Sequence, residues 1–209
     1  MSGFDWIAPL YGPIEFATAG GILQRARSAH IDTLAGRESI LSAGEGHGRF
    51  ATLCSAAHPH ARLTCVDASG GMIRRSRNRL SDHSNIEWIH ASLPEWKPAA
   101  GAHDAIVTCF FLDCFGPRTL PAVVDSLAHG ATRDALWINV DFSVPPGGFA
   151  RLRARATLAI MHAFFRAACG IDAKRLQPVA PELARHGFKP VDTQSFNFGF
   201  VTSTLWRRD

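Results

Sequence analysis

The feature that most constrains this chain is a glycine-rich turn between an apolar segment and a helical one. In "ILSAGEGHGRFATLC", residues 40–54, glycine recurs at every second position from Gly44 to Gly48. Glycine allows a tight turn and leaves no Cβ between the backbone and an approaching ligand. A strand, such a turn and a helix N-terminus together are typical of dinucleotide and nucleoside sites in α/β folds. We therefore expect a ligand of this kind to bind at the turn.

Segments of strand and helix character alternate along most of the chain. The predicted strands are 38–43, 61–69, 85–92, 103–112 and 134–142. The predicted helices are 20–36, 49–58, 69–83, 118–131, 147–170 and 180–187. This alternation is typical of a parallel sheet with helices on both faces. Residues 188–208 are predicted to form a closing hairpin that turns near Asn197 and adds one antiparallel strand.

The composition is that of a single soluble domain. The chain has 209 residues, of which 46% are apolar and 19% are charged, and this is enough for one hydrophobic core. No apolar run approaches the roughly 20 residues of a membrane helix, and the N-terminus lacks the pattern of a signal peptide. The five cysteines are scattered and odd in number, so we expect free thiols in a reducing cytoplasm. Neither a membrane partner nor a metal site is expected.

The net charge of +4 permits a nucleic-acid partner but does not favour one. Basic residues concentrate in two helical segments, 72–80 and 151–176. Such helices can form a phosphate-binding face, or they can be solvated helix surfaces. We prefer the second interpretation, because little chain is left over to build an RNA-binding appendage. The oligomeric state stays open.

The spacing of the glycines separates two classes of cofactor. NAD-type sites have the pattern Gly-x-Gly-x-x-Gly, which needs a glycine at position 49, where this chain has Arg49. The pattern Gly44-x-Gly46-x-Gly48, followed by Asp67 in "CVDAS", resembles the class I S-adenosylmethionine-dependent methyltransferases. The resemblance extends from the turn to the C-terminal hairpin. It implies S-adenosylmethionine as cofactor and a doubly wound, mostly parallel, seven-stranded α/β sheet with a C-terminal antiparallel hairpin.

In this family the acidic residue after the second strand binds both ribose hydroxyls, and the resemblance gives that role to Asp67. The alternative for Asp67 is a helix cap. The resemblance also places Ala68 and Met72 against the adenine ring, although Met72 fits a helix core equally well. The expected cofactor-binding residues are Ser42, Gly44, Glu45, Gly46, Gly48, Asp67, Ala68, Met72, Ser92, Leu93 and Phe110.

Two positions depart from the family pattern. The family usually has an acidic residue two positions before the first glycine, where it helps to bind the methionine amine, and this chain has Ser42. Glu45, inside the turn, takes over part of that role or points to solvent. Near the adenine amine the family often has another acidic residue, and here Ser92 stands at that position. A serine hydroxyl is a weaker acceptor than a carboxylate, so weak cofactor binding, or none, stays an alternative.

Acceptor chemistry is expected beyond the fourth strand, where "TCFFLDCFG" contains one charged side chain, Asp113. Burying an unpaired charge is unfavourable, so this carboxylate needs a partner or a function. It can take a proton from an acceptor hydroxyl or amine, or it can cap the next helix or pair with an arginine. Asp141 ends the fifth strand on the same side of the sheet and is a second candidate wall of the pocket.

Two further segments contribute candidates by position. Residues 1–36 resemble the family's lid, so Tyr11 is expected near the methionine end of the cofactor or as a lid aromatic without a chemical role. His162 and Arg166 lie four apart in a predicted helix and share a face. If that face covers the pocket, His162 is a base and Arg166 an anion anchor; a helical histidine is more often a surface or core residue. The catalytic candidates are Asp113, His162 and Tyr11, and the substrate-binding candidates are Phe111, Asp141, Phe165 and Arg166.

These features predict an S-adenosylmethionine-dependent methyltransferase for a small molecule, built as one domain over 1–209 with its core at 37–209. Because the cofactor carries the reactive methyl group, the protein mainly aligns the acceptor and excludes water. One alternative is an RNA or protein methyltransferase, although "FFLD" stands where many nucleic-acid amine methyltransferases have an N-P-P-Y-type motif. The other is a non-catalytic protein that binds S-adenosylmethionine or S-adenosylhomocysteine.

Overall fold

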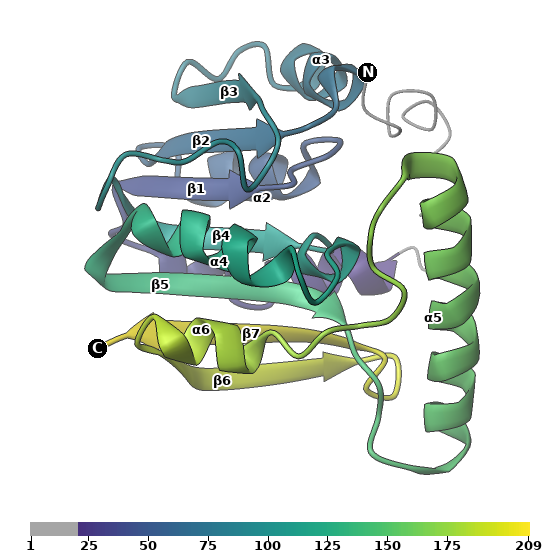
Figure 1. Ribbon diagram of the computed structural model, residues 1–209. Coiled ribbons are helices and arrows are strands. Elements are labelled where there is room, and N and C mark those ends of the chain that lie inside the picture. The colour runs from purple at the N-terminus through teal and green to yellow at the C-terminus, as the bar shows by residue number, and fades with distance from the viewer. Residues whose placement is uncertain (1–20) are drawn as a thin grey trace.

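The sheet of this protein has seven strands in the spatial order β3-β2-β1-β4-β5-β7-β6 (Figure 1). The structure, a computed structural model, describes residues 21–209. β1 to β5 pair in parallel, and β7 runs antiparallel to both β5 and β6. The predicted α/β class, with a mostly parallel sheet and a C-terminal hairpin, is confirmed. The strands are β1 (Ser39–Ala43), β2 (Arg62–Asp67), β3 (Ile86–His90), β4 (His103–Cys109), β5 (Ala131–Phe142), β6 (Phe188–Phe196) and β7 (Val201–Arg208).

The strand order reverses at the centre of the sheet. β1 pairs with β2 on one side and with β4 on the other, although β3 comes between β2 and β4 in the chain. In open α/β sheets, ligands bind outside the carboxyl ends of the strands at such a point. Because β1 ends at Ala43, the glycine turn at 44–48 lies at this position.

Helices cover both faces of the sheet, and one helix stands across its carboxyl edge. Residues 21–28 are helical. Figure 1 shows α5 upright beside the carboxyl ends of the central strands, where it can cover a ligand site. The remaining elements are η1 (Ile31–Leu34), α2 (Arg49–Ala57), α3 (Gly70–Arg79), η2 (Leu112–Cys114), α4 (Leu120–His129), α5 (Gly148–Cys169) and α6 (Ala180–Arg185).

Alternate residues of the strands contribute to two hydrophobic cores, one on each face of the sheet. In β5, Ile138 and Val140 belong to the core shared with α2 and α5, whereas Trp137 belongs to the core under α4 and α6. The period of two in a strand places Asn139 and Asp141 on the same face as Trp137. Two polar side chains therefore lie at the end of a strand whose middle is apolar.

The fourth strand is shorter than the sequence predicts. The apolar run favours a strand through Leu112, whereas β4 ends at Cys109. Phe110 has a left-handed φ of 53°, which an extended strand cannot continue. The chain then turns into η2, so the residues after β4 lie at the carboxyl edge and not within the sheet.

The N-terminal segment is divided where the sequence predicts one helix. After the helical residues 21–28, the chain turns at His30 and enters η1. The Nε2 atom of His30 lies 3.1 Å from the carbonyl oxygen of Ser203, and this contact with β7 fixes the turn. Tyr11 lies outside the described residues. Within residues 21–209, no helix has the length and apolar character needed to span a bilayer.

Candidate functional site

The glycine turn has the backbone that its sequence predicts. Gly44, Gly46 and Gly48 have φ angles of 69°, 61° and 75°, in the left-handed region that favours glycine. A Cβ on Gly44 would lie 2.1 Å from Cδ2 of Phe111, whereas a Cβ on Gly46 would meet nothing within 4 Å. The turn therefore passes directly against the Phe111 ring at one end and is open above Gly46. Such an open backbone is where a ligand can approach closely.

The carboxylate of Asp67 joins this turn to the start of α3. Its Oδ2 accepts a hydrogen bond from the Gly46 amide at 2.8 Å, and its Oδ1 accepts one from the Ser69 amide at 2.8 Å. Ser69 in turn caps α3, because its hydroxyl accepts the Met72 amide at 3.2 Å. A carboxylate has about four acceptor sites in all, so hydrogen bonds from ligand hydroxyls are compatible with these two. Asp67 thus orders the turn and remains a candidate ligand of the ribose.

Ser42 and Glu45 form a buried pair beneath the turn. The Ser42 hydroxyl donates a short hydrogen bond to Glu45, whose other carboxylate oxygen accepts the Ala51 amide at 2.9 Å. Glu45 is only 9% exposed, so it does not point to solvent. Burial raises the pKa of Glu45 to about 7, against the opposing effects of the Ala51 amide, the Ser42 hydroxyl and the charge of Arg27. Glu45 thus brings a carboxylate to the side chain of Ser42, at the position where the family usually has an acidic residue.

The residues expected around adenine follow two paired strands. Ala68 comes directly after β2, and Ser92 follows β3 closely, with Asp67 paired to His90 in the sheet. Ala68 is half-buried, and Ser92 is exposed. The Met72 side chain is buried, so its contribution to helix packing is evident in the structure. Leu93 packs against the core under α4 and α6.

The two phenylalanines after β4 turn to opposite faces of the sheet. Phe110 packs on the core that includes α2 and α5, with its ring centroid 5.1 Å from that of Phe142. The guanidinium carbon of Arg27 lies 4.9 Å from the Phe110 ring centroid. Phe111 packs on the other core and makes an edge contact with Phe115 at 5.0 Å. A left-handed non-glycine residue such as Phe110 is strained, and such strain concentrates at functional sites.

Asp113 and Asp141 come together at the carboxyl ends of β4 and β5. The Asp113 amide donates to Oδ2 of Asp141 at 3.1 Å, and the Phe142 amide donates to Oδ1 at 2.8 Å. Burial raises the pKa of Asp113, and His162 opposes this rise. Burial, followed by the charge of Asp113, raises the pKa of Asp141 well above its usual range. The two carboxyl groups line a cavity of about 160 Å³ together with Asn139, Phe142, Leu176, Gln177, Val179 and Thr202.

Asp113 neither caps the next helix nor forms an ion pair with an arginine within residues 21–209. The start of α4 is held instead by Asp172, which accepts the Gly116 amide at 2.8 Å and the Thr119 hydroxyl at 2.6 Å. The Asp113 carboxylate accepts a contact from the Cys114 thiol at 3.5 Å. The capping role that the sequence leaves open for Asp113 is thus carried out by Asp172.

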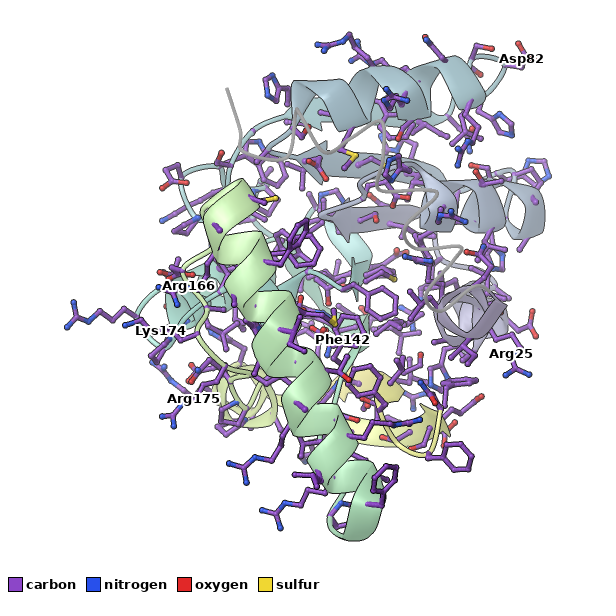
Figure 2. All side chains as sticks on the ribbon, turned by 90° about the vertical axis from the view of Figure 1, so that its right-hand side faces the viewer. Arg25, Asp82, Phe142, Arg166, Lys174 and Arg175 are labelled. Atoms are coloured by element: carbon purple, nitrogen blue, oxygen red, sulfur yellow. The ribbon has the colours of Figure 1, made fainter. Side chains whose placement is uncertain are left out.

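α5 does not bring His162 and Arg166 to the cavity together. His162 is buried, but its Nδ1 lies 2.9 Å from the Leu158 carbonyl oxygen and its Nε2 lies 3.3 Å from the Asp113 carbonyl oxygen. Both ring nitrogens therefore face the backbone, and His162 supports the turn that carries Asp113. Arg166, one turn later, is exposed (Figure 2), and Phe165 is half-buried. The expected anion anchor in the pocket wall is not observed.

Sequence reasoning missed three polar residues of the cavity wall. Asn139 lies two residues before Asp141 in β5, and its place in an otherwise apolar strand was a signal that could have been used. Gln177 and Thr202 come from the α5–α6 connection and from β7. These segments are distant in the sequence, so their meeting at the cavity could not be predicted from it.

Comparisons with known proteins agree with this geometry. A family model described as a methyltransferase domain matches residues 40–132. The sequence is 31% identical to trans-aconitate 2-methyltransferase of Afipia carboxidovorans over 107 residues, 51% of this chain and 40% of that protein. It is 40% identical to malonyl-[acyl-carrier protein] O-methyltransferase of Anoxybacillus flavithermus over 58 residues, 28% of this chain and 22% of that protein. The matches thus span less than half the length of either curated relative.

A solved structure extends the likeness over the whole fold. The 1,6-didemethyltoxoflavin-N1-methyltransferase of Burkholderia thailandensis, with bound 1,6-didemethyltoxoflavin and S-adenosylhomocysteine, is similar with a TM-score of 0.72. The two sequences are 15% identical, and the superposition covers 99% of this chain and 86% of that chain. Residues 40–132 thus match the methyltransferase domain model, and the chain shares the fold of this solved methyltransferase.

Proposed function

We propose that this protein is an S-adenosylmethionine-dependent methyltransferase that acts on a small molecule. The observation that carries the proposal is the Asp67 carboxylate, held 2.8 Å from the Gly46 amide at the mouth of an open glycine turn. This places a hydrogen-bond acceptor for ribose hydroxyls beside a backbone that a ligand can approach closely. The match of residues 40–132 to the methyltransferase domain family supports the same cofactor.

The residues of the turn fit the two ends of such a cofactor. Asp67 holds the ribose, with Ala68 on the adenine side. Glu45 and Ser42 fix the turn from beneath, close to where the methionine part lies. When bound, the cofactor supplies a sulfonium-activated methyl group. The chain's own task is to align the acceptor with it and to exclude water.

The acceptor side lies beyond Phe110 and Phe111, at the carboxyl ends of β4 and β5. Asp113 and Asp141 are placed there to orient an acceptor and to receive a proton from it. Burial raises the pKa of both carboxyl groups, which makes each a stronger base than an exposed aspartate once it is ionised. The named relatives act on different small or carrier-bound acceptors, which supports the reaction class for this chain and leaves the acceptor itself as a separate question.

Calorimetric titration with S-adenosylmethionine and S-adenosylhomocysteine tests the proposal. We expect the wild type to bind both in the micromolar range. The Asp67→Ala variant should lose about 1.5–3 kcal/mol of binding free energy, the scale of a charged hydrogen bond, or roughly ten- to a hundredfold in Kd. Asp82→Ala is the matched control, because Asp82 is exposed at the end of α3 and accepts only the Ser81 hydroxyl. No binding of either compound at millimolar concentration would reject the proposal.

A further inference from the structure

The cavity at the ends of β4 and β5 has an unbalanced set of polar groups. Two carboxyl groups line it, Asp113 and Asp141, and Asp141 is only 5% exposed. Among residues 21–209, no lysine or arginine forms an ion pair with either of them. Buried carboxyl groups are normally paired with a cation or fully hydrogen-bonded. Their hydrogen bonds come from two backbone amides and a thiol, so a cation that enters the cavity would meet two acidic groups that no described cation neutralises.

Asn139 presents a second unmet group at the same cavity. Trp137 Nε1 donates to the Thr108 hydroxyl at 3.0 Å, and that hydroxyl donates to Asn139 Oδ1 at 2.9 Å. This relay directs the amide oxygen away from solvent and leaves the NH₂ group for the cavity that Asn139 lines. Asn139 is 8% exposed, and its NH₂ group has no hydrogen-bond partner in the described part of the chain. Because Asn139 lines the cavity, this NH₂ group can donate to an acceptor atom of a molecule bound there.

The remaining walls limit the size and character of an occupant. Phe142, Leu176 and Val179 are apolar, and the volume of about 160 Å³ accommodates a few heavy atoms. An occupant must offer a cation to the carboxyl pair and an acceptor to Asn139, joined by a short carbon chain. An alkylammonium with a neighbouring hydroxyl or carbonyl oxygen meets these requirements.

We infer that this cavity binds the amino group of a cationic amine that carries a hydrogen-bond acceptor a few atoms away, and that it recognises the methyl acceptor through this group. The second half of the inference rests on the proposed function, and the first half does not. Neighbouring carboxyl groups resist double ionisation, so the pair retains a proton that an incoming ammonium displaces. The other titratable groups near the pair are Cys114 from η2 and His162 from α5, with Cys169 of α5 next to Cys114.

Three probes of similar size test the inference on the full chain without cofactor. Ethanolamine carries both the ammonium and the acceptor, ethylamine lacks the acceptor, and ethylene glycol lacks the ammonium. At concentrations up to about 50 mM and matched ionic strength, ethanolamine should raise the Tm most, ethylamine less, and ethylene glycol not at all. Calorimetry in phosphate and in HEPES buffer should give different heats for ethanolamine, because the carboxyl pair releases a proton on binding.

Two variants connect this binding to the cavity. Asp113→Asn should weaken ethanolamine binding at least about tenfold while preserving the fold, because within residues 21–209 the Asp113 carboxylate accepts from no other side chain than the Cys114 thiol. Asn139→Ala should remove the advantage of ethanolamine over ethylamine and leave ethylamine binding unchanged. Asp82→Asn is the control, since Figure 2 shows Asp82 at the upper edge of the molecule, away from Phe142 near its middle. If Asp113→Asn does not fold, the Asn139→Ala comparison decides.

Any one of three results would overturn the inference. Ethanolamine does not raise the Tm, or it raises the Tm no more than ethylene glycol does, or it binds both cavity variants as tightly as it binds the wild type. The same preparation is titrated with S-adenosylhomocysteine to separate the two proposals. Binding of S-adenosylhomocysteine without amine binding rejects this inference alone. Amine binding without S-adenosylhomocysteine binding rejects the proposed function and leaves the amine site standing.

Discussion

The two halves of the site are organised in opposite ways. Around the glycine turn, Asp67 binds Gly46 and Ser69, and Glu45 binds Ser42 and Ala51, so the polar groups satisfy one another within the chain. In the cavity lined by Asp113 and Asp141, no lysine or arginine of residues 21–209 pairs with either carboxyl group. The turn is thus completed by the chain's own backbone, whereas the cavity keeps polar groups that a bound molecule could contact.

The largest expected effect breaks the turn at its tightest point. Gly44→Ala introduces a Cβ in a left-handed residue and against the Phe111 ring, at 2.1 Å. We expect a loss of about 2–5 kcal/mol in the free energy of unfolding, measured by urea titration, and weakened S-adenosylhomocysteine binding. Gly46→Ala is the matched control, because its φ is also positive but its Cβ meets nothing. It should lose only about 1–2 kcal/mol.

Adding Phe111→Ala to Gly44→Ala separates the two causes of that loss. If contact with the ring matters, the double variant recovers part of the stability relative to the sum of the single variants. Equal losses for Gly44→Ala and Gly46→Ala would contradict the close approach of Phe111 and leave only the backbone angle as the cause.

The next effect concerns the proton on Glu45. Because the folded pKa is raised to about 7 from 4.5, the folded state binds the extra proton, and its stability falls as the pH rises from about 4.5 to 7. Glu45→Gln removes this titration while keeping an oxygen for the Ala51 amide. The stability of the variant relative to wild type should therefore increase by up to about 3 kcal/mol between pH 5 and pH 8. Chemical denaturation at several pH values measures it, and a constant difference would show that Glu45 does not titrate in this range.

The smallest expected effect is a change in cofactor affinity at Ser92. Ser92 is exposed where the family often has an acidic residue near the adenine amine. Ser92→Asp should strengthen S-adenosylhomocysteine binding about two- to tenfold, the scale of one added hydrogen bond. Ser81→Asp, at the exposed end of α3, controls for the added negative charge. Equal gains in the two variants would point to general electrostatics, and no gain would place adenine elsewhere.

The geometry of the glycine turn could be predicted from the sequence because its signals are local. The glycine spacing, the apolar strand before it and Asp67 at the end of the next strand lie within residues 40–67. The direction of the Glu45 side chain could not be predicted, since it depends on a hydrogen bond from the Ala51 amide in the first turn of α2. Similarly, the apolar run through Leu112 hid the end of β4, which is decided by the backbone of Phe110.

The cavity lined by Asp113 and Asp141 could be predicted only in part, because distant segments of the chain form it. Asp113 and Asp141 were predicted from strand ends, and the structure brings them to one cavity. His162 and Arg166 share a helical face by spacing, but spacing does not say which side of that face meets the protein. Packing turns His162 inward to two backbone carbonyls and leaves Arg166 exposed.

The double attachment of Asp67 has a consequence for turnover. Its hydrogen bonds to Gly46 and Ser69 are made to the chain's own backbone, so folding itself orders these residues. The entropy of arranging them is then lost once, during folding, and not at each binding event. Binding and release at this turn are therefore expected to need little rearrangement of the chain between cycles.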